Sequence, residues 1–390
     1  MTDRPIVSVE RCDTYDDEAV AGALDRALAP LGGIGAFVRP GQRVFVKVNL
    51  LMKAEPDRAI STHPAVVRAV VRAAKNAGAA DVAMGDSPGG RTSAAAARAL
   101  FETSGMARVA QEEGARLVLL DDDVTRVPNP DARLYTAFNL GREVAECDVL
   151  IDVPRIKTHG FMMFTGAVKN LFGCIPGLEK AQFHLKVPDR DDFAEMLVDL
   201  LLACRPALCV MDAVVGMEGE GPSGGTPKPV GALLASADAC ALDVVASAIA
   251  GFDPMAVYTV AAANRRGMCP ASADEVEIAG TPWREVAPEH FAHPARDLSR
   301  GLPPGLARWL RRRIASRPAL ARPQDCTACG TCERNCPADA VKVTDGKPRF
   351  DYDACIRCYC CQELCPANAL ALKTPWVVRS LVMRGGSKRA

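Results

Sequence analysis

The fold of the C-terminal part is decided by CTACGTCERNCP at residues 326–337 and by CIRCYCCQELCP at residues 355–366. Both runs have the spacing C-x2-C-x2-C-x3-C-P, and each cysteine of the first run recurs 29 positions later in the second run. The two runs are therefore copies of one unit. A cubic iron–sulfur cluster needs this arrangement, because three thiolates on one tight loop hold three of its corners. The fourth thiolate comes from beyond a chain reversal that the proline helps to set.

Zinc and disulfides are the competing explanations for these thiols. Zinc sites usually pair cysteines from two separated C-x2-C hairpins, a pattern that would not use three closely spaced thiols in each run. We therefore predict iron–sulfur clusters with eight metal ligands: Cys326, Cys329, Cys332, Cys336, Cys355, Cys358, Cys361 and Cys365. Cys360 precedes the ligand Cys361 directly. We interpret it as a thiol near a cluster that is not a ligand, with ligation in a shifted register as the alternative.

The pattern over residues 324–373 resembles the bacterial ferredoxins that carry two [4Fe-4S] clusters. In that family the fourth cysteine of each run ligates the cluster of the other run. The resemblance implies a small α+β ferredoxin-like domain with one cluster on Cys326, Cys329, Cys332 and Cys365 and another on Cys355, Cys358, Cys361 and Cys336.

The composition is that of an ordinary soluble globular protein, with 49% hydrophobic and 24% charged residues. Lys plus Arg equals Asp plus Glu at 47 each, and aromatic residues make up only 5%, so neither a global field nor a stacking surface favours nucleic acid. Residues 1–10 contain no apolar core of signal-peptide length. The most apolar region, residues 230–252, is interrupted by Asp238 and Asp243. We therefore expect a cytoplasmic protein without a transmembrane segment.

Upstream of the cysteines, strand-like and helix-like segments alternate. Apolar, β-branched segments predict strands at residues 43–51, 81–85, 116–120, 149–153 and 208–211. Apolar periodicity predicts helices at residues 16–29, 64–77, 92–101, 105–113, 193–204 and 239–250. This alternation predicts an α/β fold with a mostly parallel sheet and flanking helices. Residues 216–231 contain six glycines and three prolines, and we expect them to form a mobile or ligand-covering loop.

The composition also changes along the chain. We expect an α/β domain at residues 1–280, a connector rich in proline and arginine at 281–323, the cluster domain at 324–373 and a basic tail at 374–390. Residues 306–317 within the connector predict a basic helix. We interpret it as a solvated helix that packs one apolar stripe, with contact to a membrane or an acidic partner as the alternative.

The densest group of chemically active side chains before residue 300 lies between Pro154 and His184. An open α/β sheet binds ligands at the carboxyl edge of its strands, where a loop with lysine, threonine and histidine follows. Lysines there, Lys180 included, can hold a phosphate or carboxylate, and histidines can transfer protons. We therefore predict four catalytic residues: Lys157, His159, Lys169 and His184. The alternative is that each of these side chains only satisfies local backbone groups or pairs with an aspartate.

Four further polar residues are predicted to contact a cofactor: Asn170, Asp86, Asp212 and Glu218. Both aspartates follow an apolar strand, where carboxylates often line a cleft, although aspartate is also common in turns and helix caps. Capping is the expected role of Asp238. The sequence has no G-x-x-x-x-G-K-[ST] or G-x-G-x-x-G turn after a strand, so it supports neither a P-loop nor a dinucleotide site of the usual kind.

Residues 153–177, 211–225 and 236–254, with the turn at 85–90, resemble the bacterial and archaeal family called domain of unknown function 362. The resemblance covers residues 40–270, and members of that family often carry a C-terminal ferredoxin module. The family name carries no settled reaction. A fainter likeness, in the outline of His159, Gly166, Lys169 and Pro176-Gly177, is to the nickel-pincer lactate racemases. Gly166-Ala167 stands where those enzymes have two glycines, which argues against a bound nickel cofactor.

Together these features predict an iron–sulfur oxidoreductase. It would exchange electrons with a redox partner protein or carrier and pass them through two [4Fe-4S] clusters to or from a small anionic substrate or cofactor in the α/β domain. Two alternatives stay open: an electron carrier or scaffold that docks a partner enzyme, and a racemase-like, non-redox enzyme with structural clusters. The direction of electron flow, a flavin or other organic cofactor and the oligomeric state do not follow from the sequence.

Overall fold

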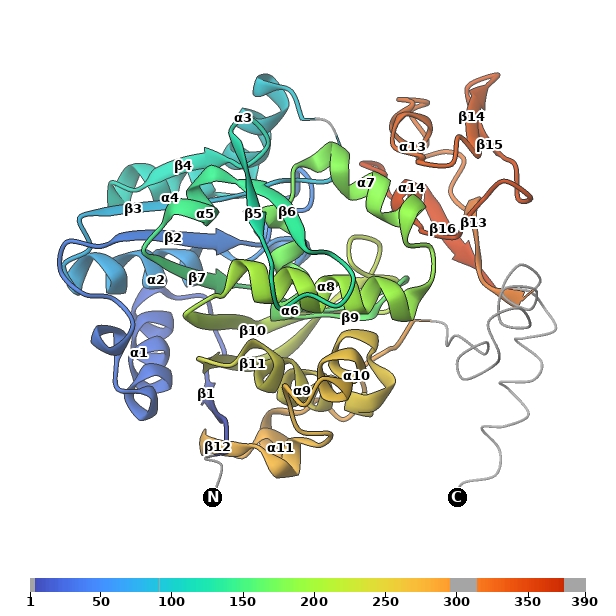
Figure 1. Ribbon diagram of the computed structural model, residues 1–390. Coiled ribbons are helices and arrows are strands. Elements are labelled where there is room, and N and C mark those ends of the chain that lie inside the picture. The colour runs from blue at the N-terminus through green and yellow to red at the C-terminus, as the bar shows by residue number, and fades with distance from the viewer. Residues whose placement is uncertain (1–3, 91, 295–313, 375–390) are drawn as a thin grey trace, which may run out of the picture.

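The computed structural model describes residues 4–90, 92–294 and 314–374, and a ten-stranded sheet forms the centre of this part (Figure 1). Its strands are β1 (Ile6–Arg11), β2 (Arg43–Val48), β3 (Asp81–Asp86), β4 (Arg116–Leu119), β7 (Val149–Val153), β8 (Arg155–His159), β9 (Met163–Thr165), β10 (Leu208–Glu218), β11 (Thr226–Ser236) and β12 (Glu277–Gly280). Their order is β12-β1-β11-β10-β7-β2-β3-β4, with β8 beside β10 and β9 beside β8. The strands from β10 to β4 are parallel, whereas β11 is antiparallel to both of its neighbours.

Helices cover both faces of the sheet. One face carries α1 (Asp17–Leu28), α2 (Pro64–Asn76), α3 (Ala94–Thr103) and α4 (Met106–Glu113); the other carries α6 (Ala167–Asn170), α8 (Arg190–Cys204), α9 (Ala239–Ile249) and α10 (Tyr258–Arg265). Each face has its own hydrophobic core. Within β2, Val44 and Val46 pack in the core on the side of α1 to α4, and Phe45 packs in the core on the side of α6 to α10. Strands buried on both sides are typical of parallel sheets. Three further α-helices and a hairpin belong to this part: α5 (Arg142–Glu146), α7 (Gly177–Lys186), α11 (Trp283–Val286), β5 (Val124–Pro128) and β6 (Ala137–Gly141).

The predicted α/β class is confirmed, and the helices start where local signals indicate. The Asp16 carboxylate accepts hydrogen bonds from the backbone N–H groups of Glu18 and Ala19 at the start of α1. Asp238 accepts the N–H groups of Cys240 and Ala241 in the same way at the start of α9. Such caps satisfy N–H groups that have no partner within the helix.

The predicted loop at residues 216–231 is wrong. β10 continues to Glu218 and pairs with β11 from Thr226, so only residues 219–225 connect the two strands. The prolines at 227 and 229 indicated a loop, but in the described chain β1 pairs with β11 only from Ala232 to Ala235. One side of β11 is therefore free near these prolines, and a missing N–H can face that side without loss of a ladder hydrogen bond.

The polar segment after β7 is not a loop either. Arg155–His159 forms β8, which pairs in parallel with the extended β10 and, through Lys157 opposite Thr165, in antiparallel with β9. The unexpected length of β10 is the physical reason, because it provides the edge on which β8 forms. The segment therefore holds Lys157 and His159 on a strand.

Residues 314–374 form a second structure, the cysteine-rich unit. It contains β13 (Arg317–Leu320), α13 (Thr331–Arg334), β14 (Val341–Thr344), β15 (Lys347–Phe350), α14 (Cys360–Glu363) and β16 (Leu370–Lys373). β13 pairs with β16, and β14 pairs with β15. The backbone repeats with the sequence, since positive φ values at Ala328, Gly330 and Asp339 recur 29 positions later at Arg357, Tyr359 and Asn368. The predicted small α+β class of this unit is confirmed.

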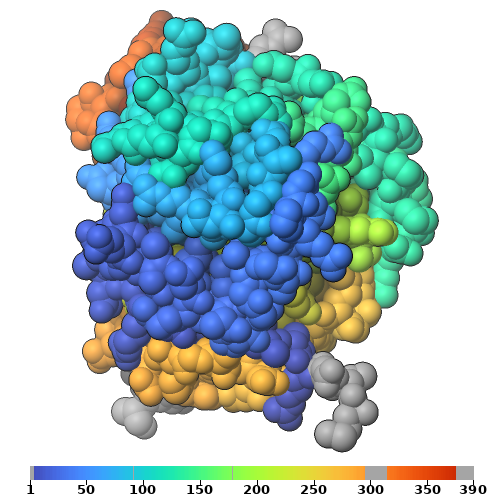
Figure 2. Space-filling model, turned by 90° about the vertical axis from the view of Figure 1, so that its left-hand side faces the viewer, coloured from blue at the N-terminus to red at the C-terminus, as the bar shows by residue number. Residues whose placement is uncertain are grey.

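The cysteine-rich unit packs on loops of the α/β part where glycines allow close approach. A Cβ atom on Gly89 would lie 2.4 Å from Leu364 Cδ2, and one on Gly224 would lie 2.5 Å from Gln362 Nε2. The Ser223 hydroxyl also donates a hydrogen bond of 2.7 Å to the Glu363 carbonyl. Figure 2 shows a face covered mainly by the N-terminal helices, where the unit is visible only along one edge.

Some predictions concern residues outside the described ranges. The predicted basic helix at 306–317 lies mostly outside them, although Arg317 itself begins β13. The basic tail at 374–390 also lies outside them, apart from Thr374. The three boundaries between the four expected segments stay predictions.

Candidate functional site

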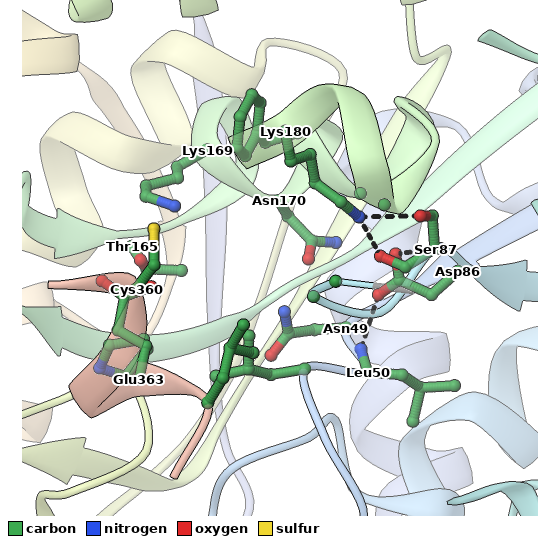
Figure 3. A pocket seen from close by; sticks show the side chains of 18 of the residues that line it. Asn49, Leu50, Asp86, Ser87, Thr165, Lys169, Asn170, Lys180, Cys360 and Glu363 are labelled. Carbon is green, nitrogen blue, oxygen red and sulfur yellow. Dashed lines mark hydrogen bonds between the residues drawn. The ribbon is translucent and has the colours of Figure 1, made fainter. Parts of the chain in front are cut away.

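A cavity of about 110 Å³ lies between the carboxyl edge of the sheet and the cysteine-rich unit. Its polar lining consists of Asn49, Asp86, Ser87, Lys157, His159, Thr165, Lys169, Asn170, Lys180, His184, Asn335, Cys360 and Glu363. Figure 3 shows side chains from distant parts of the chain around this space. The structure thus brings together all four predicted catalytic residues and two of the four predicted cofactor contacts.

α6 is positioned by a carboxylate from another helix. Asp243 of α9 accepts the backbone N–H groups of Ala167 at 2.6 Å and Val168 at 3.1 Å. Gly166 makes this approach possible, because a Cβ atom there would lie 2.0 Å from Asp243 Oδ1. The helix is therefore fixed at its first residues, and Lys169 follows at the cavity.

Lys157 is a buried amine with neutral partners. Its Nζ donates hydrogen bonds to Asn49 Oδ1 at 2.6 Å and to the Ile60 carbonyl at 2.7 Å. Burial, reinforced by the charges of Arg155 and Lys169, lowers the pKa of Lys157 to about 7. A large share of the Lys157 amine is consequently uncharged near neutral pH.

Lys169 supplies a cation to the cavity. Within the described chain its Nζ has no hydrogen bond or ion pair, and it lies 5.5 Å from the centre of the Phe172 ring. Burial lowers the pKa of Lys169, and the nearby Glu363 opposes this shift. Figure 3 shows the amine directed toward Thr165 and Cys360. Lys169 can therefore donate hydrogen bonds to an anion in the cavity.

Two further polar atoms near Lys169 are buried without a partner in the described chain: Thr165 Oγ1 and Asn170 Oδ1. The amide nitrogen of Asn170 donates to Asp152 Oδ1 at 2.7 Å, which fixes its orientation and leaves the oxygen free. Buried polar groups are nearly always satisfied, so orphaned atoms along one cavity wall indicate a place for a ligand.

The tautomer of His159 follows from its neighbours. The backbone N–H groups of Phe161 and Met162 point at His159 Nδ1 at 3.0 and 3.3 Å, so this nitrogen is an acceptor. Burial holds the pKa of His159 well below its usual range, and the neutral ring therefore carries its hydrogen on Nε2. Nε2 lies 3.4 Å from Glu363 Oε1 without a well-aligned hydrogen bond. His159 is thus a neutral hydrogen-bond donor.

His184 belongs to an aromatic wall of the cavity. Its ring stacks on Phe193 at 4.6 Å and meets Phe161 and Phe172 edge-on. Burial lowers the pKa of His184 to about 3, so the ring is neutral at physiological pH. The predicted catalytic role of His184 is not tested by the structure. The contacts of its ring are with phenylalanine side chains.

Asp86 and Lys180 stabilise the part of the cavity wall at the turn after β3. The Asp86 carboxylate accepts the N–H groups of Leu50 and Ser87 and forms an ion pair of 2.9 Å with Lys47. Lys180 donates to the Ser87 hydroxyl at 2.8 Å, and burial lowers the pKa of Lys180 to about 8 (Figure 3). Asp86 lines the cavity, but its oxygens hold the turn after β3.

Asp212 and Glu218 do not line the cavity. The prediction that they share one site with Lys157 and Lys169 is therefore corrected. Asp212 accepts hydrogen bonds from the Tyr15 hydroxyl and the His63 N–H, and lies 3.6 Å from Arg155. Glu218 accepts the N–H of Ala292. Both carboxylates follow apolar residues, but each is directed to a local structural partner.

The cysteine-rich unit contributes the part of the wall that the sequence did not indicate. Cys360 and Glu363 lie on α14 beside the predicted ligands Cys361 and Cys365, and Asn335 lies beside Cys336. Glu363 is 194 positions from Lys169 in the chain, so no local pattern could join them. Burial raises the pKa of Glu363 to about 7, against the effect of Lys169.

The cysteines are grouped as a pair of cubic clusters would require. Cys326, Cys329, Cys332 and Cys365 line one small cavity. Burial raises the pKa of Cys361 well above its usual range, and the nearby thiols of Cys358, Cys355, Cys336 and Cys332 add to this shift. Cys358 and Cys355 likewise raise the pKa of Cys336 after burial, so the second group of predicted ligands lies close together and near Cys332. The N–H groups of Ala340 and Ala369 donate to the sulfurs of Cys336 and Cys365 at 3.2 and 3.3 Å. Thiolates with such donors fit iron–sulfur ligation.

The described residues contain neither a single-ion metal site nor a membrane-spanning helix. No three His, Cys, Asp or Glu side chains in residues 4–90, 92–294 and 314–374 converge on a single metal-ion position. A cubic cluster does not need such convergence, because each thiolate binds its own iron atom. In the same residues, no helix has the length and apolar character needed to span a bilayer.

Family models match both parts of the chain. The family described as domain of unknown function (DUF362) matches residues 44–248, more than half of the chain. The chain belongs to the DUF362 family. A second model, the 4Fe-4S dicluster domain, matches residues 319–366 of this DUF362 protein. The predicted resemblances to both families are therefore confirmed, and the C-terminal part is a 4Fe-4S-binding domain of the ferredoxin type.

A relative and two solved structures are similar to this DUF362 protein. A thylakoid-associated protein of Synechocystis is 38% identical over 276 residues, which cover 69% of this chain and 81% of the relative. A lactate racemase apoprotein from Thermoanaerobacterium thermosaccharolyticum is 14% identical with a TM-score of 0.38, over 60% of this chain and 54% of that one. A protein from Thermotoga maritima is 14% identical with a TM-score of 0.35, over 56% and 54%. The chain spans about half of each solved structure, and these two likenesses are too distant to bear on the site.

Proposed function

We propose that this DUF362 protein is an iron–sulfur oxidoreductase that passes electrons through two [4Fe-4S] clusters to or from a small anionic ligand in the cavity. One observation carries the proposal: Asn335 and Cys360, which adjoin cysteines of one predicted cluster, line the same cavity as Lys169, whose Nζ has no hydrogen bond or ion pair among the described residues. An electron donor and an anion site on opposite walls of one cavity are what reduction of a bound anion requires.

The grouping of the cysteines supports the two ligand sets that the ferredoxin resemblance implies. The cluster on Cys326, Cys329, Cys332 and Cys365 exchanges electrons with a redox partner protein, because Cys329 is exposed. The cluster on Cys336, Cys355, Cys358 and Cys361 exchanges electrons with the cavity ligand. Clusters of this type supply single electrons, and their potentials span a range too wide for the fold to set the direction of flow.

Residues of the α/β part bind and orient the ligand. Lys169 and Thr165 donate hydrogen bonds to its anionic group, and the free Asn170 oxygen accepts one. His159 donates from Nε2, which stabilises negative charge that develops as the ligand is reduced.

The test is anaerobic reoxidation of the chemically reduced protein. Small molecules released from anaerobically purified protein are identified by mass spectrometry, and each candidate anion is added to reduced protein while cluster absorbance is followed. Lys169→Met should raise the anion concentration that gives half-maximal reoxidation about tenfold, because one charge-assisted hydrogen bond to the anion is lost. His159→Ala should abolish reoxidation with both clusters intact. Lys186→Met is the control, because Lys186 is exposed on α7. Unchanged reoxidation in both site variants would reject the proposal.

A further inference from the structure

Lys157 differs from the other lysine buried in the sheet. Lys47 forms an ion pair of 2.9 Å with Asp86, so its charge is compensated. In the part of the chain that the structure describes, no carboxylate lies within ion-pair distance of Lys157, and its two hydrogen-bond partners are neutral. Since an uncompensated buried charge is costly, Lys157 is an amine selected for something other than a permanent charge.

The geometry of Lys157 leaves one position on its nitrogen free. Two N–H groups are donated to Asn49 and to the Ile60 carbonyl, both fixed by the fold. In the uncharged amine the remaining position is a lone pair, and Lys157 is among the side chains that line the cavity. A desolvated lysine amine beside other cations is the usual nucleophile toward carbonyl carbon.

We propose that Lys157 forms a Schiff base with a small oxo acid in the cavity. The nitrogen forms a C=N bond to the carbonyl carbon, and the carbonyl oxygen leaves as water with both amine hydrogens of the neutral amine. Lys169 binds the carboxylate of the acid, a role that rests on the anion site of the proposed function. A cavity of about 110 Å³ has room for on the order of ten water molecules, which suits an oxo acid of three to five carbons.

The pH dependence distinguishes this amine from surface lysines. Arg155 on β8 and Lys169 on α6 favour its neutral form, while Asp86 on β3 and Glu363 on α14 oppose them. The pKa of Lys157 is lowered to about 7, so the reactive neutral form increases as the pH rises through 7. An exposed lysine, with a pKa of about 10.4, gains its neutral form only in more alkaline solution.

Reductive trapping tests the proposal. The full-length protein with oxidised clusters is incubated with pyruvate and cyanoborohydride, and the reduced adduct is located by peptide mass mapping. The adduct is expected on Lys157, with a yield that rises around pH 7. Adducts found only on exposed lysines, or a yield that rises only in alkaline solution, would overturn the proposal without the need for any variant.

Variants and a second probe sharpen the test. Lys157→Arg should lose the adduct, whereas Lys186→Arg should keep it. Lys169→Met removes a charge that helps to keep Lys157 neutral, so capture of acetone, which has no carboxylate, should fall somewhat, and capture of pyruvate should fall about tenfold further. Equal losses with both carbonyl compounds would contradict the role of Lys169. Trapping involves no cluster electrons, so its failure leaves the reoxidation test standing, and failure of reoxidation leaves the trapping result standing.

Discussion

The two cysteine runs have the same spacing and the same backbone but different surroundings. In the first run Cys329 is exposed and Cys326 and Cys332 are partly exposed, whereas in the second run Cys358 and Cys361 are buried. The difference therefore arises outside the ligands. One duplicated unit can thus present one cluster to other proteins and the other to an internal cavity, because the residues between the cysteines decide what covers each loop.

The two runs differ at equivalent positions between their cysteines. Gly330 of the first run corresponds to Tyr359 of the second, and both have positive φ values, of 72° and 68°. Tyr359 is 2% exposed and its hydroxyl donates to the Ser316 carbonyl at 3.0 Å. A bulky residue in the left-handed region is strained. Burial against the α/β core offsets that strain in the second run alone.

The largest difference is expected when one ligand of each run is removed. Cys358→Ala and Cys329→Ala should each lose about half of the cluster iron. Only Cys358→Ala should abolish reoxidation by the cavity ligand, since Cys329→Ala keeps the cluster beside the cavity and can be reduced chemically. Iron content and anaerobic reoxidation measure the two effects. Reoxidation at the normal rate in Cys358→Ala would contradict the assigned path.

The second largest difference is expected in the stability of the Tyr359→Gly variant. Loss of a buried aromatic side chain costs about 3–5 kcal/mol, and relief of left-handed strain returns about 1–2 kcal/mol. A net loss of about 1–4 kcal/mol in unfolding free energy is expected from denaturant titration. Gly330→Ala in the exposed run is the control, and it should cost the strain and a small shift of the Arg334 side chain, whose Nη1 would lie 2.7 Å from the new Cβ atom. An equal loss in both variants would remove the proposed role of burial.

A smaller effect is expected where the second run meets the sheet edge. A Cβ atom at Gly89 would lie 2.4 Å from Leu364 Cδ2, so Gly89→Val should cost about 1–3 kcal/mol through overpacking. Leu364→Ala in the same chain should recover part of this loss, which thermal unfolding of the single and double variants measures. Asn335, the counterpart of Leu364 in the first run, faces Gly90 in the same turn. Additive losses would show that Gly89 and Leu364 do not meet.

The smallest effect is expected at Cys360. Its counterpart in the first run is Thr331, so Cys360→Thr copies the exposed run into the buried one. If Cys360 is not a ligand, the iron content should not change, and the unfolding free energy should fall by only about 1 kcal/mol, since threonine adds one methyl group at a position that borders the cavity. Loss of half of the iron would instead establish ligation in the shifted register.

Local signals predicted most of the fold. Apolar periodicity and caps such as Asp16 and Asp238 depend on neighbours in sequence, and they placed the main helices and parallel strands. The prolines at 227 and 229 misled, because whether a proline interrupts a strand depends on a neighbour, β1, that pairs with only part of β11.

The site was less predictable, because its walls come from distant segments. Lys157, His159 and Lys169 lie within a short stretch and were found by their density. Asp212 was wrongly predicted to contact a cofactor, because its carboxylate accepts a hydrogen bond from Tyr15, which is almost 200 positions away in the chain. No sequence pattern indicates that Glu363 of the second run faces His159. Such contacts follow from how the cysteine-rich unit packs on the sheet edge.

The glycine-lined contact between Gly89 and Leu364 has a kinetic consequence. In the proposed function the donor cluster and the binding site of the acceptor belong to one chain, so transfer to the bound ligand is intramolecular and its rate should not depend on protein concentration. A tethered partner has an effective concentration in the millimolar range, or higher when it is already in contact. A free ferredoxin would compete poorly for this position, and dilution of the protein would slow only the loading of electrons at the exposed end.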